Sequence, residues 1–533
     1  MEQDKRAAVL MKRYKTLQQH RNNWESHWQE VADYVVPRKA DVTKNRSPGD
    51  KRSELVFDGT AIHAAELLSA SLHGMLTNMS TKWFTLEYRD PMLNGDDTAR
   101  EWLLSVEDVM YRTFQRSNFS EQVHEMYLDL ITFGTSVMFV EQDTITDVNF
   151  STRHIGECYI SEDKRGRVDT VYRVFNMPGH ALRDRFGVDK LSKKLQDRIE
   201  EYPHDAVELV HAVYPRDNYD VTMATKENKP FASVYYEPTE TVVLSEGGFD
   251  ELPYVVPRYQ KSSTEIYGRS PSMTALPDIK MLNKMSETTI RAAQKQVDPP
   301  LLVPDDSFIL PIKTVPSGLN FYRSGTRDRI EPLNIGANNP LGLNMEEQRR
   351  GAIRSAFYVD QLIMGQGPQM TATEVVQRTE EKMRLLGPSM FRIQTELLQP
   401  LITRVYAILA RDQKFIPAPE MIRTADVEIE YVSPLAKAQR QVDVTSLTQM
   451  LELMGPIGQI NPQVFDYVDF DGVAKHLIKT LSIPATIIKG DDDVARTRQE
   501  RAAQQQQMME QQQLAQQAEA LGAAAPMVAA VNK

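Results

Sequence analysis

The sequence predicts a mixed α+β protein built from several domains. Three observations support this class: apolar residues recur at helical spacing over residues 3–36, short β-prone runs fill residues 135–260, and long helical patterns return after residue 271. With 533 residues, 41% of them apolar and 25% charged, the chain has room for two to four ordinary domains, each with its own core.

The N-terminal half begins with helices. The apolar positions of the first helix step by three, four or seven, and Pro37 ends it: Leu10, Tyr14, Leu17, Trp24, Trp28, Val31 and Val35. Further helices are expected over about 58–79, 96–117 and 120–133. Strands are expected at Val137–Val140, Val168–Val174, Val207–Tyr214, Ser233–Tyr236 and Thr241–Leu244. A helical stretch over 176–200 interrupts them, which is typical of an α+β domain packed on one sheet.

Residues 271–296 form one helix by pattern, with two different faces. Ile279, Leu282, Ile290 and Ala293 cluster on one side. Lys280, Lys284, Arg291 and Lys295 fall within roughly 60° of one another on the other side, with Glu287 as the single acid among them. The commoner interpretation of such a stripe is a solvated helix face, paired in part with neighbouring acids. The alternative is a row of weak, sequence-independent contacts to nucleic-acid phosphates.

The C-terminal half is punctuated by proline and glycine. Prolines exclude a helix between 298 and 340, where short strands are expected at 301–303, 308–312 and 319–322. A helix over 344–363 precedes the hinge Gly365-Gln366-Gly367-Pro368. Thr371 and Glu374 then have the spacing of a capping box, which starts a helix that runs to about residue 411 and is kinked or divided at Pro388 and Pro400.

Beyond residue 411 the pattern predicts a strand at 427–431 and helices at 435–453 and 463–482. The segment 494–506 is expected to be helical after the acidic run 491–493. The glutamine-rich tract from residue 504 fits a helix and a disordered tail equally well.

Motifs of several enzyme and metal-binding classes are missing. There is no Gly-x-x-x-x-Gly-Lys-Ser/Thr phosphate loop, no His-Glu-x-x-His and no Gly-x-Ser-x-Gly. Asp469-Phe470-Asp471-Gly472 resembles part of a calcium loop but lacks its other ligands, so a turn is expected there. The single cysteine, Cys158, is expected to be a small buried side chain. These features predict a protein that is not an enzyme and has no metal or cofactor.

The net charge of −11 argues against tight binding of nucleic acid, since phosphate neutralisation supplies most of that affinity. The charged N-terminus does not fit a signal peptide, and no apolar run has the length of a membrane span. We therefore expect no association with a membrane.

Six short segments carry a family resemblance, in the same order along the chain. They are Phe133-Gly134-Thr135, Tyr267-Gly268-Arg269-Ser270-Pro271, Ala275-Leu276-Pro277-Asp278-Ile279, Asp298-Pro299-Pro300, Met370-Thr371-Ala372-Thr373-Glu374-Val375 and Tyr431-Val432-Ser433-Pro434-Leu435-Ala436. Over residues 1 to about 480 the chain resembles the portal proteins, or head-to-tail connectors, of short-tailed bacteriophages.

The resemblance implies a domain organisation. Residues 1–265 would form an α+β wing, 266–296 a first stem helix, 297–343 a clip and 344–363 a second stem helix. A tunnel loop at 364–370 would lead into a long kinked wing helix and a returning strand at 371–440, followed by a helical crown with a Gln-rich tail at 441–533.

The resemblance also implies a function: a closed ring of about twelve copies at one capsid vertex of the virion, assembled in the host cytoplasm, that nucleates the head and passes double-stranded DNA in packaging and ejection. Implied partners are the terminase motor, the scaffolding and major capsid proteins, the tail adaptor and the internal core proteins. The stem stripe and the tunnel loop, Met364, Gly365, Gln366, Gly367, Pro368, Gln369 and Met370, would face the DNA.

Docking is expected at the clip, on Pro299, Pro300, Pro304, Pro311 and Pro316. Two alternatives remain from the sequence: another ring-forming virion protein, such as a tail tube or adaptor, and a soluble enzyme.

Overall fold

The computed structural model describes residues 2–44, 46–47, 49–94, 96–220, 225–302, 331–332, 340–362, 387–422, 427–430, 444, 446–456, 468–480 and 494–509. The chain divides into two compact units. Unit 1 consists of Met1–Thr85, Glu107–Phe415 and Ile429–Pro434, and unit 2 of Leu86–Val106, Ile416–Glu428 and Leu435–Lys533.

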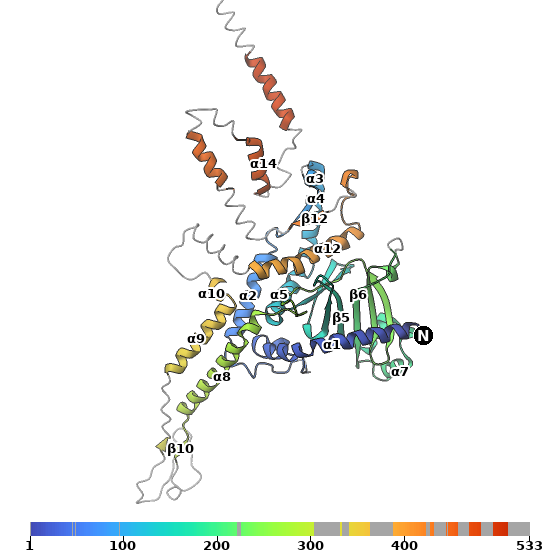
Figure 1. Ribbon diagram of the computed structural model, residues 1–533, viewed down its shortest axis with the longest axis vertical. Helices are drawn as coiled ribbons and strands as arrows, with labels where there is room; N and C mark the ends of the chain where they lie inside the picture. Colours follow the sequence, from blue (N-terminus) through green and yellow to red (C-terminus); the bar gives the residue numbers. More distant parts are fainter. Residues whose placement is uncertain are drawn as a thin grey trace, which may run out of the picture. The chain divides into compact units, whose positions relative to one another are not determined.

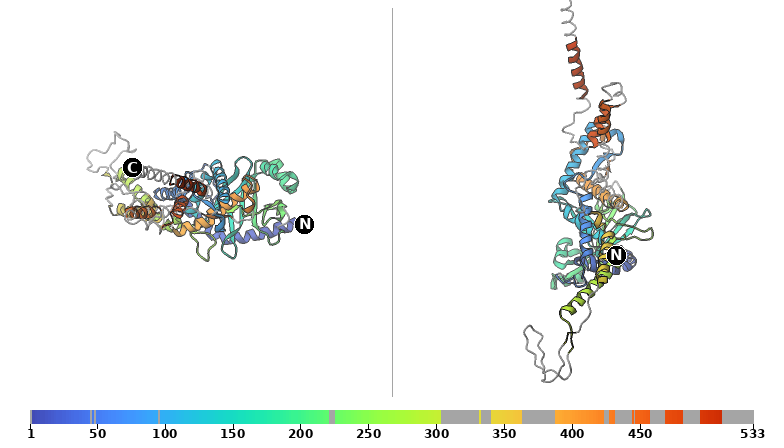
Figure 2. Two further views of the ribbon diagram at one scale, coloured as in Figure 1. Left: turned by 90° about the horizontal axis from the view of Figure 1, so that it is seen from above. Right: turned by 90° about the vertical axis from the view of Figure 1, so that its left-hand side faces the viewer.

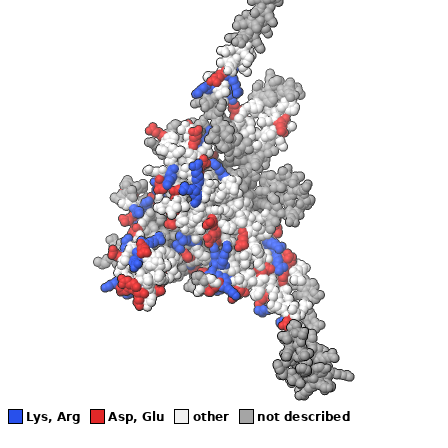
Figure 3. All heavy atoms as spheres, turned by 180° about the vertical axis from the view of Figure 1, so that it is seen from behind, with Lys and Arg blue, Asp and Glu red and all other residues white. Residues whose placement is uncertain are grey.

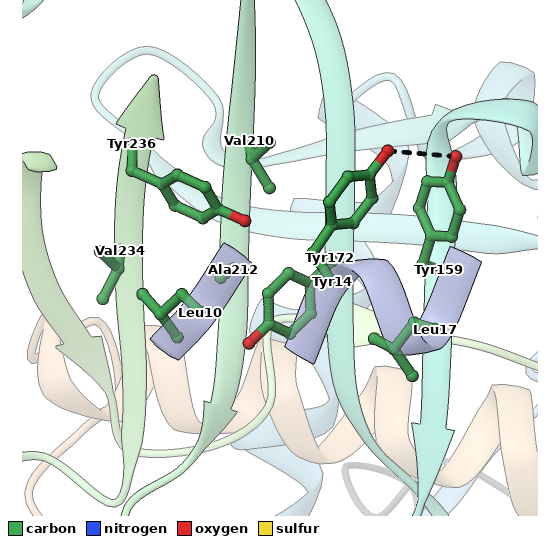
Figure 4. Close-up of a cluster of buried hydrophobic side chains, with 9 residues drawn as sticks. All are labelled: Leu10, Tyr14, Leu17, Tyr159, Tyr172, Val210, Ala212, Val234 and Tyr236. Carbon is green, nitrogen blue, oxygen red and sulfur yellow. Dashed lines mark hydrogen bonds between the residues drawn. The ribbon is translucent and has the colours of Figure 1, made fainter. Parts of the chain in front are cut away.

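The first helix, α1 (Glu2–Val35), confirms the helix predicted over 3–36, and the short helix η1 (Pro37–Lys39) follows its end. Its apolar stripe packs on the sheet of unit 1 in a cluster of nine buried residues: Leu10, Tyr14, Leu17, Tyr159, Tyr172, Val210, Ala212, Val234 and Tyr236. Figure 4 shows this cluster, with the hydrogen bond from Tyr14 Oη to Tyr159 Oη marked by a dashed line. Further along α1, Trp28 is fully buried and its indole N–H donates to the carbonyl of Phe133 at 3.1 Å.

The larger sheet is an antiparallel meander of five strands in chain order. Its strands are β4 (Cys158–Glu162), β5 (Val168–Pro178), β6 (Ala206–Pro215), β7 (Phe231–Glu237) and β8 (Val242–Phe249). The face opposite α1 is covered by α6 (Gly179–Phe186), η3 (Val188–Lys190) and α7 (Lys193–Glu201). Two short 3-10 helices, η2 (Ile155–Glu157) and η4 (Lys226–Asn228), precede β4 and β7. The strands predicted at 168–174, 207–214, 233–236 and 241–244 are confirmed.

A smaller antiparallel sheet has the order β3-β2-β9, with β2 (Val137–Asp143), β3 (Asp147–Arg153) and β9 (Tyr254–Val255). Helices α2 (Thr60–Leu76) and α5 (Phe119–Phe133) pack against each other beside it. The predicted strand at 137–140 is confirmed within β2, whereas β3 was missed. In β3 only Val148 and Phe150 are buried, so its pattern is too polar to stand out in the sequence.

Two of the segments that carried the family resemblance meet in space. Gly134 ends α5 with a φ of 75°, and its amide N–H donates to the carbonyl of Leu130. The backbone of Gly268 lies so close that a Cβ on either glycine would come within 2.3 Å of the other's carbonyl oxygen. Thr135 Oγ1 accepts from the amide of Gly268 at 2.8 Å. The two glycines therefore serve a close backbone approach.

A helical hairpin follows. Its first arm is α8 (Pro271–Val297), which confirms the helix predicted over 271–296, and its second arm is α9 (Pro340–Ala356), which packs along α8 (Figures 1 and 2). The single helix predicted over 344–363 is interrupted: Tyr358 has a φ of 58°, and α10 (Val359–Leu362) starts after it. Because a left-handed backbone cannot continue an α-helix, the chain turns at this residue.

Between the arms, the described residues form a two-stranded antiparallel ladder of β10 (Leu301–Leu302) and β11 (Glu331–Pro332). This agrees with the strand predicted at 301–303. The strands predicted at 308–312 and 319–322, the tunnel loop at 364–370 and the capping box at 371–374 lie outside the described residues.

The last helix of unit 1 covers residues 387–411. Its centre is a π-helical turn, η5 (Gln394–Leu398), which leads directly into α12 (Gln399–Arg411). The irregularity predicted at Pro400 thus takes the form of a π turn, because the proline ring cannot fit beside the carbonyl of the residue four positions earlier in a regular α-helix.

A two-stranded sheet pairs β1 (Thr85–Tyr88) with β12 (Val427–Glu430), and the residues of both strands are divided between the two units; β12 confirms the strand predicted at 427–431. Around it in the sequence are α3 (Pro91–Asn94), the start of α4 (Asp97–Arg116) and η6 (Glu420–Ile422). Helices also cover 446–456, α14 (Phe470–Thr480) and 494–509. The tract described to residue 509 is helical, and Asp469 caps α14 by accepting from the amides of Asp471 and Gly472, as a turn should.

Candidate nucleic-acid interface on the α8–α9 hairpin

Helix α8 starts at a fixed point in the core. Ser270 is its N-cap: the hydroxyl accepts from the amide of Met273 at 3.0 Å and donates to the carbonyl of Thr132 at 2.8 Å. Pro271 occupies the first helical position, where its missing N–H costs nothing. The buried Asn283 accepts from the amides of Phe57 and Asp58, which holds the helix midpoint. The first half of α8 is therefore held firmly, and this fixes the direction in which the second half of the helix leaves the core.

The predicted basic stripe lies on the exposed side of α8, as the pattern required. Lys280, Lys284, Arg291 and Lys295 are all exposed, whereas Ile279 and Leu282 are buried on the opposite side. The predicted apolar face is only partly used, because Ile290 is 43% exposed and Ala293 is exposed. The core of unit 1 ends near Ser286, and the last three turns of α8 extend beyond it.

Ion pairs modify the stripe. Lys280 pairs with Glu30 of α1, and this hydrogen bond raises the pKa of the lysine. Glu287 lies between Lys284 and Arg291, at 2.9 Å and 2.6 Å from them. The hydrogen bond from Lys284, together with the charge of Arg291, lowers the pKa of the Glu287 carboxyl. Within the described part of the chain, Lys295 has no ion-pair partner.

The stripe thus carries four cations against two carboxylates, a net charge of +2 rather than +4. This agrees with the interpretation as a solvated helix face paired in part with neighbouring acids, whereas contact with nucleic-acid phosphates stays a prediction. Exposed pairs of this kind are weak and screened by salt, so their cations stay available to a phosphate. Figure 3 shows the same mixing of sign over the face that it presents, where blue and red atoms alternate.

The second arm is bound to the first by polar contacts that the sequence did not reveal. Arg349 Nη1 lies 2.7 Å from Asp278, and Thr289 donates to Glu346 at 2.6 Å. Arg350 joins Glu346 to Asp58, at 3.1 Å and 3.0 Å. Except for Glu346 and Arg350, which are one helical turn apart and whose spacing was visible in the sequence, these pairs join residues far apart in the chain.

The remaining predicted site residues are placed only in part. Pro299 and Pro300 follow the end of α8 directly, beside the β10–β11 ladder. Pro304, Pro311, Pro316 and the tunnel-loop residues 364–370 lie outside the described residues. The described residues hold no group of three or more His, Cys, Asp or Glu side chains placed to bind a metal ion, and none of their helices is long and apolar enough to cross a membrane.

The sequence matches one family of known proteins over most of its length. Residues 7–488 match the family described as "Bacteriophage head to tail connecting protein". A "Probable portal protein" of Bordetella phage BPP-1 is 32% identical over 506 residues, which is 93% of this chain and 91% of the relative. A "Portal protein" of Salmonella phage epsilon15 is 31% identical over 504 residues, 92% of this chain and 90% of the relative.

Among solved structures, a chain titled "Neck of empty GTA particle computed with C6 symmetry" aligns with 72% of this chain and 84% of its own length. The TM-score is 0.33 and the identity 11%, which is too low to support a conclusion about the fold. The family match and the two phage relatives together cover nearly the whole sequence. The chain belongs to the bacteriophage head-to-tail connecting protein family.

Proposed function

We propose that the chain is a portal subunit: about twelve copies close into a ring at one capsid vertex, and double-stranded DNA passes through the bore during packaging and ejection. The observation that carries the proposal is the family match over residues 7–488, with relatives named portal proteins. In this proposal α8 lines the bore, and its four cations face the DNA. A head-to-tail rotation that closes is the symmetry such a ring requires.

The charge of the chain favours a channel through which DNA slides over a site that binds DNA tightly. Twelve copies of a chain with a charge of −11 carry about −132, so the wall repels DNA on average. Because the stripe retains only +2 per subunit after pairing with Glu30 and Glu287, each local contact with a phosphate is weak. Weak contacts that do not read sequence allow the duplex to slide.

The other parts of the proposal follow the same organisation. The residues between α8 and α9, with the β10–β11 ladder, form the clip on which the terminase motor and later the tail adaptor dock. The segment 364–370 is the tunnel loop that narrows the bore, and the helices after 440 form the crown towards the capsid interior with the core proteins. Scaffolding and major capsid proteins meet the ring as the head assembles, and the place of action is the head–tail junction of the virion.

The stripe is tested by reversing its charge. In the variant with Lys284→Glu and Arg291→Glu, we expect rings to assemble normally but packaging or ejection to be impaired, because the bore would then repel DNA at every subunit. The matched control is Lys190→Glu with Lys193→Glu, two exposed lysines beside and within α7, which should leave the phage unaffected. Normal DNA content and titre for the stripe variant would show that α8 does not face the DNA.

The ring itself is tested by negative-stain images of the purified protein. A portal gives rings with a central hole wide enough for a duplex. A tail tube or adaptor gives tubes or small rings, and a soluble enzyme gives featureless globules.

Deletion of residues 365–369 tests the tunnel loop separately. Rings should form but retain DNA poorly, and infectious particles of normal yield would count against the proposed role of the loop.

A further inference from the structure

A partly buried network of ion pairs contacts the middle of the helix over residues 387–411. Glu396, in the π turn, accepts three hydrogen bonds from Arg258: from its backbone N–H at 3.0 Å, from Nε at 2.9 Å and from Nη2 at 2.7 Å. Arg392, one turn earlier, donates to the same carboxylate at 2.9 Å. With four N–H donors, this carboxylate is close to its full capacity as an acceptor.

The other side of the network reaches the five-stranded sheet. Arg258 is 1% exposed; it also pairs with Glu162 at the end of β4 and donates to the carbonyls of Gly166 and Ile266. Burial by itself lowers the pKa of Arg258, but the hydrogen bonds and charges of Glu396 and Glu162 outweigh it and raise the pKa above its ordinary value. Lys261 adds a second cation to Glu162 at 2.6 Å. The helix is therefore tied to the sheet through one arginine.

The π turn has a local cause as well. It contains one residue more than the α turn it replaces, and the amide of Gln399 donates to the carbonyl of Gln394. Pro400 lacks an N–H, and in a continuous α-helix its ring would clash with the carbonyl of Glu396. Two influences thus hold the irregular turn: the proline from one side and the Arg258–Glu396 contact from the other.

We propose that Arg258 and Glu396 form a register latch, which holds the π turn and thereby sets which face residues 387–393 turn towards the core. Without the latch and the proline, the extra residue is absorbed into regular α-helix. One residue corresponds to a rotation of about 100°. Residues 387–393 then turn by that angle relative to α12. The buried Ile393 and Ser389 leave the core, and the exposed Phe391 changes its environment.

The consequence for the protein rests on the proposed portal function. Residues 387–393 come after the proposed tunnel loop in the sequence, so their register sets the direction from which the chain enters the π turn and α12. Arg258 and Glu396 are in this sense positioning residues: they act on the bore through the helix and touch no DNA themselves.

Thiol labelling tests the latch without any assumption about DNA. The single native cysteine, Cys158, is fully buried. Alkylation therefore reports on the introduced thiol alone. In an Ile393→Cys background, alkylation should be slow. Adding Glu396→Gln and Pro400→Ala together should accelerate it at least tenfold, while either change alone should have a much smaller effect. Phe391→Cys marks the fast limit, since Phe391 is 69% exposed.

A matched control exists on the same helix. Glu251 binds Arg404 and Arg411 of α12 at 2.6 Å, away from the π turn, so Glu251→Gln should leave the alkylation rate at position 393 unchanged. The latch is refuted if the combined variant labels as slowly as its parent, or if Cys158 becomes reactive at the same time, since the network would then only hold the fold together. Ring formation, scored by electron microscopy on the same variants, reports separately on the proposed function.

Discussion

At the residue scale, single side chains explain why particular residue types occupy particular positions. Gly134 and Gly268 approach so closely that neither tolerates a Cβ. Cys158, Arg173, His211 and Tyr235 face one another across β4 to β7 in the same register. The close approach of the two glycines and the alignment of the four strand residues both involve neighbours that are distant in the sequence. They could therefore be recognised only in the folded chain.

Gly134→Ala should destabilise unit 1 by about 2–4 kcal/mol, because it adds a left-handed strain to a clash with the backbone of Gly268. The free energy of unfolding, measured in urea, checks this value. Gly74→Ala is the control: Gly74 lies in α2 with open space around it, and alanine there should stabilise by about 0.5–1 kcal/mol. Equal effects of the two variants would argue against the close approach.

Because His211 is buried, we expect the free energy of unfolding to depend on pH. Its ring lies between Tyr254 Oη at 2.8 Å and Ser233 Oγ at 3.0 Å, and burial lowers its pKa from 6.5 to about 3. Since the unfolded chain then binds the proton more readily than the folded chain, the contribution to stability is complete above pH 6.5 and is lost as the pH falls towards 3. By pH 5 the loss should be about 2 kcal/mol.

Urea denaturation at pH 7 and pH 5 isolates the contribution of His211. The variant His211→Gln should be less stable at pH 7, since it disturbs a buried hydrogen-bonded site. Its further loss between pH 7 and pH 5 should be smaller than that of the natural chain. An identical loss in both proteins would mean that His211 titrates normally.

Among the helices and strands, two amphipathic helices, α1 and α8, show how one apolar face directs packing. Helix α1 covers one face of the five-stranded sheet through one stripe, while its other side carries exposed residues such as Val9. Helix α8 follows the same rule until Ser286 and then extends beyond the core with exposed Ile290 and Val297. Apolar side chains that stay exposed beyond the core are typical of a surface that a larger assembly covers.

Leu10→Ala should cost about 2–4 kcal/mol, because the side chain is 3% exposed against the sheet in Figure 4. Val9→Ala, one residue earlier and 66% exposed, should change the free energy of unfolding by less than about 0.5 kcal/mol. The midpoint of thermal unfolding of the two variants measures the difference. Comparable losses would show that α1 does not dock by this stripe.

At the scale of the whole molecule, one thiol reports on the integrity of the fold. Cys158 is fully buried in β4, and burial raises the pKa of its thiol to about 12. We expect no alkylation of the native chain at pH 8 over hours and complete alkylation in denaturant. Ile145→Cys, at a turn position that is 80% exposed, should react within minutes under native conditions. Rapid labelling of Cys158 itself would mean that β4 opens readily.

From the sequence alone one could infer the class of fold, most helices and strands, the position of the basic stripe on α8, and the family. These follow from periodicity, proline placement and short motifs, which act within a few residues. The strand β3 and the break at Tyr358 were missed, since polar strands and single backbone angles leave little periodic signal. Folding was needed to show that Glu30 pairs with Lys280 of the stripe, and that Arg258 binds Glu396 in a π turn. Both depend on charges brought together across more than a hundred residues or on one extra residue in a turn, which no local pattern encodes.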